Sequence, residues 1–495
     1  MLRAGKRVEG GIGRKIWPLL ILVAACVCRL WLGRTKRDDA CMGITGSVEC
    51  VEQWWLRARP FAPEPVWQDV VTAGWCLLLL GLLYILETRL GASVKLRSLQ
   101  DTISSPSSCT PSLLYRQTPL NKKLASLPCL SSPYYPPPWA PTSMGIAGHM
   151  QSAMFCMYCP PRHWRAISHM TSVMQPIKCS YDGGHVPVTW WEPEGIAFAE
   201  DAPVVLMLPG VCGQPDNMYV KRMALALAER LGWRTVVKGW RGFGFELTTP
   251  RPETWDEVAL QDTLDVIQML REKVGPKVPI YGVGHSYGGC LLTTLVGAYP
   301  ASKHMLSGVV SISGLFDFQE MMRHIASEWD WLYDHINTKM TLKNHERFKV
   351  VDALCGQGNL YPGGYLDITN IKGHREFHKR FTIPYTQDDS VDCYLDRLEC
   401  MTRAGFGSVN VPVLALLSKD DPLCPPKVWG KALKAASGND YIIVVQTEWG
   451  GHCGWFSGMS GDSWLDDVAV EFLRTILEEQ KAQDASPPPT ARRGG

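Results

Sequence analysis

Residues 279–290 read Pro-Ile-Tyr-Gly-Val-Gly-His-Ser-Tyr-Gly-Gly-Cys, and the expected fold is built outward from them. The pattern is typical of a buried strand, a sharp turn and the start of a helix. Ser286 stands at the turn, within Gly284-His-Ser-Tyr-Gly288, which has the G-x-S-x-G spacing of a nucleophile elbow. A serine on so tight a turn is strained, and glycine on either side avoids collisions between strand and helix. A glycine-rich turn without a catalytic role has the same pattern. The rest of the sequence therefore has to decide between a nucleophile elbow and a purely structural turn.

The composition is that of a globular protein with a large core. The 495 residues are 46% hydrophobic and 20% charged, and the net charge is +2. No run of five basic residues occurs, which argues against nucleic acid and strongly acidic partners. The 17 cysteines have no regular spacing, so reduced, buried thiols are expected rather than a disulfide framework. The single C-x-x-C pair, Cys156 and Cys159, is a weak indication of zinc without a second pair.

Two apolar runs near the N-terminus predict a membrane anchor within residues 1–99. The candidate helices are 16–32, which Arg29 interrupts, and 70–86, which contains no charge and approaches the length of a bilayer span. A signal peptide is the alternative for the first run, and a buried core helix is the alternative for the second. Basic residues flank both runs, so their distribution favours a cytosolic catalytic domain only slightly. The endoplasmic reticulum is a candidate location.

The chain after residue 99 divides into three parts. Residues 100–145 are rich in Pro and Ser, which predicts either a disordered linker or an arm laid over the globular domain. Residues 146–480 form the expected globular domain, and 481–495 a disordered tail. Within the domain, short apolar runs alternate with helical patterns, which indicates an α/β fold with a mostly parallel sheet between helices. The expected strands are 204–208, 234–238, 280–283, 308–313, 411–417 and 441–446; the expected helices are 219–231, 254–274, 287–299 and 464–478.

Candidate site residues follow the ends of these strands. A glycine-rich turn, 209–213, follows the first strand, and Ser286 follows the third. The loops 418–425 and 448–455 follow the last two strands and contain Asp-Asp-Pro and Gly-Gly-His. In a parallel sheet these strand ends share one edge, where ligands bind. A serine, an acid and a histidine in this chain order are the set required for acyl transfer.

At this point the chain resembles the α/β-hydrolase superfamily. The closer resemblance is to its membrane-anchored lipase/esterase branch, AB hydrolase superfamily type 4, which includes abhydrolase-domain-containing proteins one, two and three and the medium-chain ethyl-ester synthase/esterases. The resemblance covers about residues 145–480. The matching motifs are Gly148-His-Met-Gln-Ser152 (with Ser152 in place of threonine), Leu208-Pro-Gly-Val-Cys-Gly213, Trp240-Arg-Gly-Phe-Gly244, Leu247-Thr-Thr-Pro-Arg251, Asp420-Asp-Pro422 and Gly450-Gly-His-Cys-Gly454.

The resemblance implies a role for each site residue. Ser286 would be the nucleophile, His452 the general base, and Asp421 the acid that orients His452. The backbone N–H groups of Val211 and Tyr287 would form the oxyanion hole, and no metal or organic cofactor is implied.

Four further predictions accompany the triad. The neighbouring Asp420 is the alternative acid, although we expect it to cap the turn. Arg241 is expected to fix a loop beside the site rather than take part in the chemistry. His149 is expected to make a structural hydrogen bond, with contact to the substrate as the alternative. The insert at about 315–407 is expected to form a helical cap over Ser286.

The predicted activity is hydrolysis of lipid acyl esters such as monoacylglycerols, phospholipids or medium-chain esters. The expected partners are therefore a lipid ester substrate and a membrane. One alternative is an acyltransferase that passes the same acyl group to an alcohol. Another is a non-catalytic membrane scaffold that binds lipid and retains the fold.

Overall fold

A computed structural model gives the fold of the chain. The chain divides into Met1–Leu99 and Gln100–Gly495, and all elements described here belong to the second unit. The structure describes residues 110–485 with gaps. The gaps are 138–139, 141–146, 156–157, 244–247, 250–253, 372, 459–460, and 327–370 except for Asp334 and Thr338.

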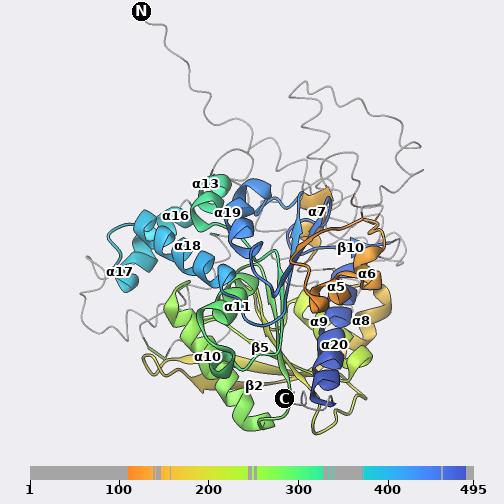
Figure 1. The fold of residues 1–495 in the computed structure, drawn as a ribbon. Helices are drawn as coiled ribbons and strands as arrows, with labels where there is room; N and C mark the ends of the chain where they lie inside the picture. Colours follow the sequence, from red (N-terminus) through yellow and green to blue (C-terminus); the bar gives the residue numbers. More distant parts are fainter. Residues whose placement is uncertain are drawn as a thin grey trace, which may run out of the picture. The chain divides into compact units, whose positions relative to one another are not determined.

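A nine-stranded sheet forms the centre of this unit (Figure 1). Its strand order is β1-β9-β8-β7-β6-β4-β5-β3-β2, and the run from β9 to β5 is parallel. Antiparallel strands complete the sheet: β1 pairs with β9 at one edge, and at the other β3 pairs with β5 and carries the edge strand β2. The strands of this sheet are β1 (Ser112–Tyr115), β2 (Thr171–Lys178), β3 (His185–Glu192), β4 (Val204–Leu208), β5 (Arg234–Lys238), β6 (Ile280–His285), β7 (Val309–Ile312), β8 (Val413–Ser418) and β9 (Ile442–Thr447); β10 (Phe456–Ser457) and β11 (Asp462–Ser463) form a separate pair.

Helices cover both faces of the sheet. On one face lie α10 (Glu257–Val274), α11 (Tyr287–Ala298), α13 (Phe318–Ala326), α18 (Val391–Gly407) and α19 (Pro426–Ala436). On the other lie α5 (Pro119–Ala125), α6 (Pro128–Ser131), α8 (Pro161–Ser168), α9 (Met218–Leu231) and α20 (Trp464–Ala485). The remaining helices are α7 (Ala147–Met154), α12 (Ala301–His304), α16 (His374–Phe377), the π-helix η4 (His378–Thr382) and α17 (Ile383–Thr386).

The two helical layers explain why the central strands are apolar throughout. Successive side chains of a strand point to opposite faces. In β4, Val204, Leu206 and Leu208 therefore belong to one core, while Val205 and Met207 belong to the other. All five side chains are fully buried. The prediction of a mostly parallel sheet flanked by helices is confirmed.

The sheet begins earlier in the chain than residue 146. The strand β1 pairs antiparallel with β9 through Leu113 and Val445, which places part of the Pro/Ser-rich segment within the sheet. Asn121 of α5 strengthens this attachment, because its amide donates hydrogen bonds to the carbonyl groups of Arg116 and Asp440. At the other end, α20 continues to Ala485, so the first residues of the expected tail are helical.

Several expectations fall outside the described residues. Both apolar runs, 16–32 and 70–86, lie there, as do residues 486–495 of the tail and the middle of the expected cap. Among the residues that the structure describes, no helix has the length and apolar character needed to cross a membrane. Of the segment predicted to form a cap, the structure describes α13 and the group α16 to α18, which lies next to α13 in Figure 1. Two of these helices, α13 and α18, belong to the layer on one face of the sheet, and the cap itself stays a prediction.

Candidate active site

The elbow places Ser286 at the junction of β6 and α11. Ser286 has a positive φ of 52°, an unusual conformation for a residue other than glycine. The flanking glycines are required by close backbone contacts. A Cβ at Gly284 would lie 2.4 Å from the carbonyl carbon of Gly288, and a Cβ at Gly288 would lie 2.2 Å from the carbonyl oxygen of Leu208. Larger residues at either position would push apart the strand, the helix and the neighbouring loop.

His452 joins Ser286 to Asp421. Its Nε2 lies 2.9 Å from Ser286 Oγ, and its Nδ1 lies 2.8 Å from Asp421 Oδ2. The three residues come from the ends of β6, β8 and β9, which meet at one edge of the sheet. The structure therefore brings together the three side chains that the sequence analysis selected.

Asp421 and His452 each stabilise the charged form of the other side chain. Burial alone would raise the pKa of Asp421, but the charge and hydrogen bond of His452, together with the backbone N–H groups of Cys424 and Leu423, lower it. Burial alone would lower the pKa of His452, but the Asp421 carboxylate and further contacts raise it well above its usual value. Asp421 is thus held ionised, and it stabilises a positive charge on His452.

Asp420 occupies a different position in the same turn. Its Oδ1 accepts hydrogen bonds from Ser418 Oγ at 2.5 Å and from the Gly451 N–H at 2.8 Å. Burial raises the pKa of Asp420 to about 6. His452 Nδ1 donates its hydrogen bond to Asp421, whereas Asp420 links the turn to the histidine loop.

The turn after β4 lies against the nucleophile. A Cβ at Gly210 would come within 3.4 Å of Ser286 Cβ. The carbonyl of Gly210 accepts hydrogen bonds from Trp240 Nε1 at 2.9 Å and from the Gly213 N–H at 2.9 Å, which fix the turn. Val211 follows Gly210 in this turn, and Tyr287 is the first residue of α11. These are the two residues whose backbone N–H groups are expected to form the oxyanion hole.

The segment Gly148–Ser152 holds the backbone of the loop that contains His452. Ser152 Oγ accepts a hydrogen bond of 2.6 Å from the His452 N–H and donates one of 2.6 Å to the Gly148 carbonyl. Gln151 Oε1 accepts hydrogen bonds from the Tyr134 hydroxyl and the Phe456 N–H. Tyr134 and the contact of Gln151 were not predictable from the sequence, because no local pattern indicates a partner 305 residues away. The side chain of His149 is exposed on α7.

Arg241 is a structural residue beside the site. Its guanidinium is 1% exposed and binds both carboxylate oxygens of Asp262 on α10 and of Asp182 in the β2–β3 turn. Burial alone would lower the pKa of Arg241, but the two carboxylates raise it. Arg241 thus fixes the loop after β5 to α10 and to the hairpin.

A largely aromatic pocket lies between the turn after β4 and the helices α16 and η4. It adjoins the elbow at Tyr287. Burial holds the pKa of His378 well below its usual value, so this side chain is neutral. The lining residues are Val211, Cys212, Trp240, Phe243, Thr254, Trp255, Tyr287, His374, Phe377, His378, Phe381, Thr382 and Tyr394.

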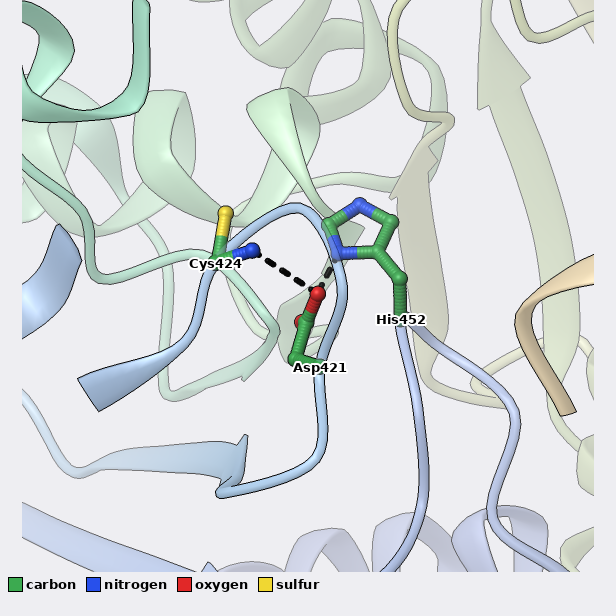
Figure 2. Close-up of side chains that lie close together, drawn as sticks. All are labelled: Asp421, Cys424 and His452. Carbon is green, nitrogen blue, oxygen red and sulfur yellow. Dashed lines mark hydrogen bonds and ion pairs between the residues drawn. The ribbon is translucent and has the colours of Figure 1, made fainter. Parts of the chain in front are cut away.

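Two groups of side chains in the described part of the chain have the composition of metal ligands. One comprises Asp421, Cys424 and His452, and the other comprises Cys179, Asp262 and Asp265. In the second group, Arg241 already binds both oxygens of Asp262. The first group is drawn in Figure 2.

The chain is similar in sequence to known hydrolases. Residues 203–348 match the family model of the alpha/beta hydrolase fold. Phospholipase ABHD3 of Mus musculus is 27% identical over 363 residues, which cover 71% of this chain and 80% of the relative. Monoacylglycerol lipase ABHD2 of Danio rerio is 23% identical over 383 residues, which cover 72% and 83%.

Proposed function

Since this chain belongs to the α/β-hydrolase superfamily and is a carboxylic ester hydrolase, we propose that it cleaves lipid acyl esters through an acyl-enzyme on Ser286. The observation that carries the proposal is the position of His452, which contacts both Ser286 Oγ and Asp421. The names of the relatives, a phospholipase and a monoacylglycerol lipase, support lipids as the substrate class. Apolar aromatic side chains line the pocket beside Tyr287, and we propose that the acyl chain lies against them.

The mechanism follows from the atoms in contact. Ser286 Oγ attacks the ester carbonyl while His452 Nε2 takes its proton, and Asp421 stabilises the imidazolium that forms. The backbone N–H groups of Val211 and Tyr287 bind the oxyanion, at the positive end of the α11 dipole. His452 then gives the proton to the leaving alcohol. Water, activated by the same His452, hydrolyses the acyl-enzyme and releases the acid.

A fluorophosphonate probe tests the role of Ser286. The probe should label the wild-type chain but not Ser286→Ala, and ester hydrolysis should fall by at least about 10³-fold in the variant. Ser437→Ala, which changes a partly buried serine at the end of α19, is the control and should retain both activities. Labelling of folded Ser286→Ala to the wild-type extent would exclude Ser286 as the nucleophile.

Substrate class needs a separate measurement. Wild-type and Ser286→Ala proteins are incubated with monoacylglycerol, phospholipid, medium-chain and short-chain esters, with and without added alcohol. We expect Ser286-dependent release of fatty acid from the lipid esters. Cleavage of short-chain esters alone would contradict the lipid proposal, and a new ester formed in place of fatty acid would identify an acyltransferase.

A further inference from the structure

The thiol of Cys424 lies beside Asp421 and His452, and the proposed hydrolysis does not use it. Cys424 is 2% exposed and lies on the same turn as Asp421, three residues further along the chain. The ring of His452 faces this turn from the loop after β9 (Figure 2). One ligand atom each from Asp421, Cys424 and His452 lies within 4.8 Å of the other two. A carboxylate, a thiol and an imidazole thus lie close enough together, in the protein interior, to bind one metal ion.

These three groups are all ligands that zinc uses in proteins. Zn²⁺ binds carboxylate oxygen, thiolate sulfur and imidazole nitrogen in tetrahedral sites, and three protein ligands leave the fourth position to water. We propose that Asp421, Cys424 and His452 form an inhibitory Zn²⁺ site, and that zinc binding reversibly stops ester hydrolysis. The inhibition rests on the proposed role of His452 as the base, whereas the binding does not.

The charges and hydrogen bonds of the site fit a divalent cation. Asp421 Oδ1 already accepts hydrogen bonds from the N–H groups of Leu423 and Cys424, both at 2.8 Å, so this oxygen keeps its position while Oδ2 binds the metal. The Cys424 thiol is buried beside the Asp421 carboxylate. A cation of charge +2 would balance the carboxylate and the thiolate, which a buried site otherwise cannot hold together.

Coordination would also change the proton on His452. The neutral ring that serves as the base carries its proton on Nδ1, next to Asp421, and presents a lone pair on Nε2 to Ser286. When Nδ1 binds zinc, the single ring proton moves to Nε2, and the thiol releases its own proton to solvent. The nitrogen that faces Ser286 is then a donor and cannot accept the serine proton. Zinc therefore blocks the first step without occupying the acyl pocket.

The second group of possible metal ligands, Cys179, Asp262 and Asp265, lacks this charge balance. Asp262 is fully engaged with Arg241, and Asp265 binds the backbone N–H and hydroxyl of Ser180. A cation placed beside the buried guanidinium of Arg241 would be repelled by it. The inference is thus limited to the group around Cys424.

The test compares Cys424→Ala and Cys424→Ser with a matched control. Hydrolysis of a short-chain ester by the full-length chain is measured as Zn²⁺ or Mg²⁺ is added, and EDTA is added at the end. We expect zinc, but not magnesium, to inhibit the wild type, and EDTA to restore activity. The two Cys424 variants should need at least about 100-fold more zinc, since even loss of an outer partner costs 10–100-fold in affinity. Cys393→Ala, which removes an exposed thiol on α18, should behave as the wild type.

A spectroscopic measurement separates this inference from the proposed activity. Cobalt(II) replaces zinc, and the thiolate-to-cobalt absorption of the wild type is compared with that of the Cys424 and Cys393 variants. Loss of one cobalt-thiolate site in the Cys424 variants alone would support the site even if no ester were hydrolysed. Equal zinc sensitivity of wild type and both Cys424 variants, or equal cobalt spectra, would overturn it.

Discussion

Among single side chains, His452 determines how activity depends on pH. The Asp421 carboxylate and further contacts raise the pKa of His452 well above its usual value against the effect of burial. Only the neutral ring can accept the Ser286 proton. We therefore expect kcat/KM to increase as the pH rises through the pKa of His452, with half-maximal activity above about pH 6.5, the ordinary value for histidine. A pH–rate profile with a soluble ester measures this directly.

Removal of the Asp421 charge should shift that profile in the opposite direction. In Asp421→Asn, burial of His452 is no longer opposed by the carboxylate, so the pKa of His452 falls and the rising limb moves to lower pH. The rate should also fall by about 10⁴-fold, because the ring loses the partner that selects its tautomer. Asp420→Asn serves as the control and should lose less than about tenfold. A larger loss of activity in Asp420→Asn than in Asp421→Asn would show that Asp420, and not Asp421, is the acid that orients His452.

The candidate triad could be selected from the sequence because each member follows a strand end. The choice between Asp420 and Asp421 came from the resemblance, since both precede the same proline and local pattern does not separate them. The contact between Ser152 and the His452 N–H joins residues 300 positions apart, and no periodicity or spacing indicates such a contact. Cys424 was missed for a related reason: its distance to His452 depends on how two loops face each other.

Among the helices and strands, the central parallel strands were predictable because both faces are covered. Their side chains form continuous apolar runs, as in the fully buried β4 and β8. The edge strands give no such signal. The strand β2 is mostly exposed along its length and contains Pro176, while β1 has four residues in a Pro/Ser-rich segment. Their position is set by pairing with β3 and β9, which is a tertiary effect that outweighs local propensity.

Arg241 connects the β2–β3 hairpin, the loop after β5 and helix α10 to one another. The stability of the fold should therefore depend strongly on this side chain. Arg241→Met would leave Asp262 buried without its cation, so we expect the free energy of unfolding to fall by about 3–5 kcal/mol. Arg375→Met is the control, because Arg375 and Asp392 form an exposed ion pair whose loss should cost less than about 1 kcal/mol. Urea denaturation of both variants measures the difference. Equal destabilisation would show that Arg241 contributes no more than a surface pair.

For the chain as a whole, the remaining question is what holds the hydrolase unit at its substrate. The two apolar runs at 16–32 and 70–86 precede every described strand and helix. We propose that they anchor the protein in a membrane, with the endoplasmic reticulum as the candidate organelle and the hydrolase unit on the cytosolic side. An anchored enzyme would meet lipid esters without first extracting them into water.

This anchoring proposal predicts how the protein partitions between membrane and solution. The full-length chain should remain with the membranes after washing with high salt and alkaline carbonate, because apolar insertion does not depend on charge. A variant that lacks residues 1–99 should move to the supernatant and still react with a fluorophosphonate at Ser286, since every described element follows residue 110. In sealed vesicles, protease should remove the hydrolase unit of the full-length chain without detergent. Release of the full-length chain by carbonate would contradict the anchor, whereas protection from protease would contradict only the cytosolic orientation.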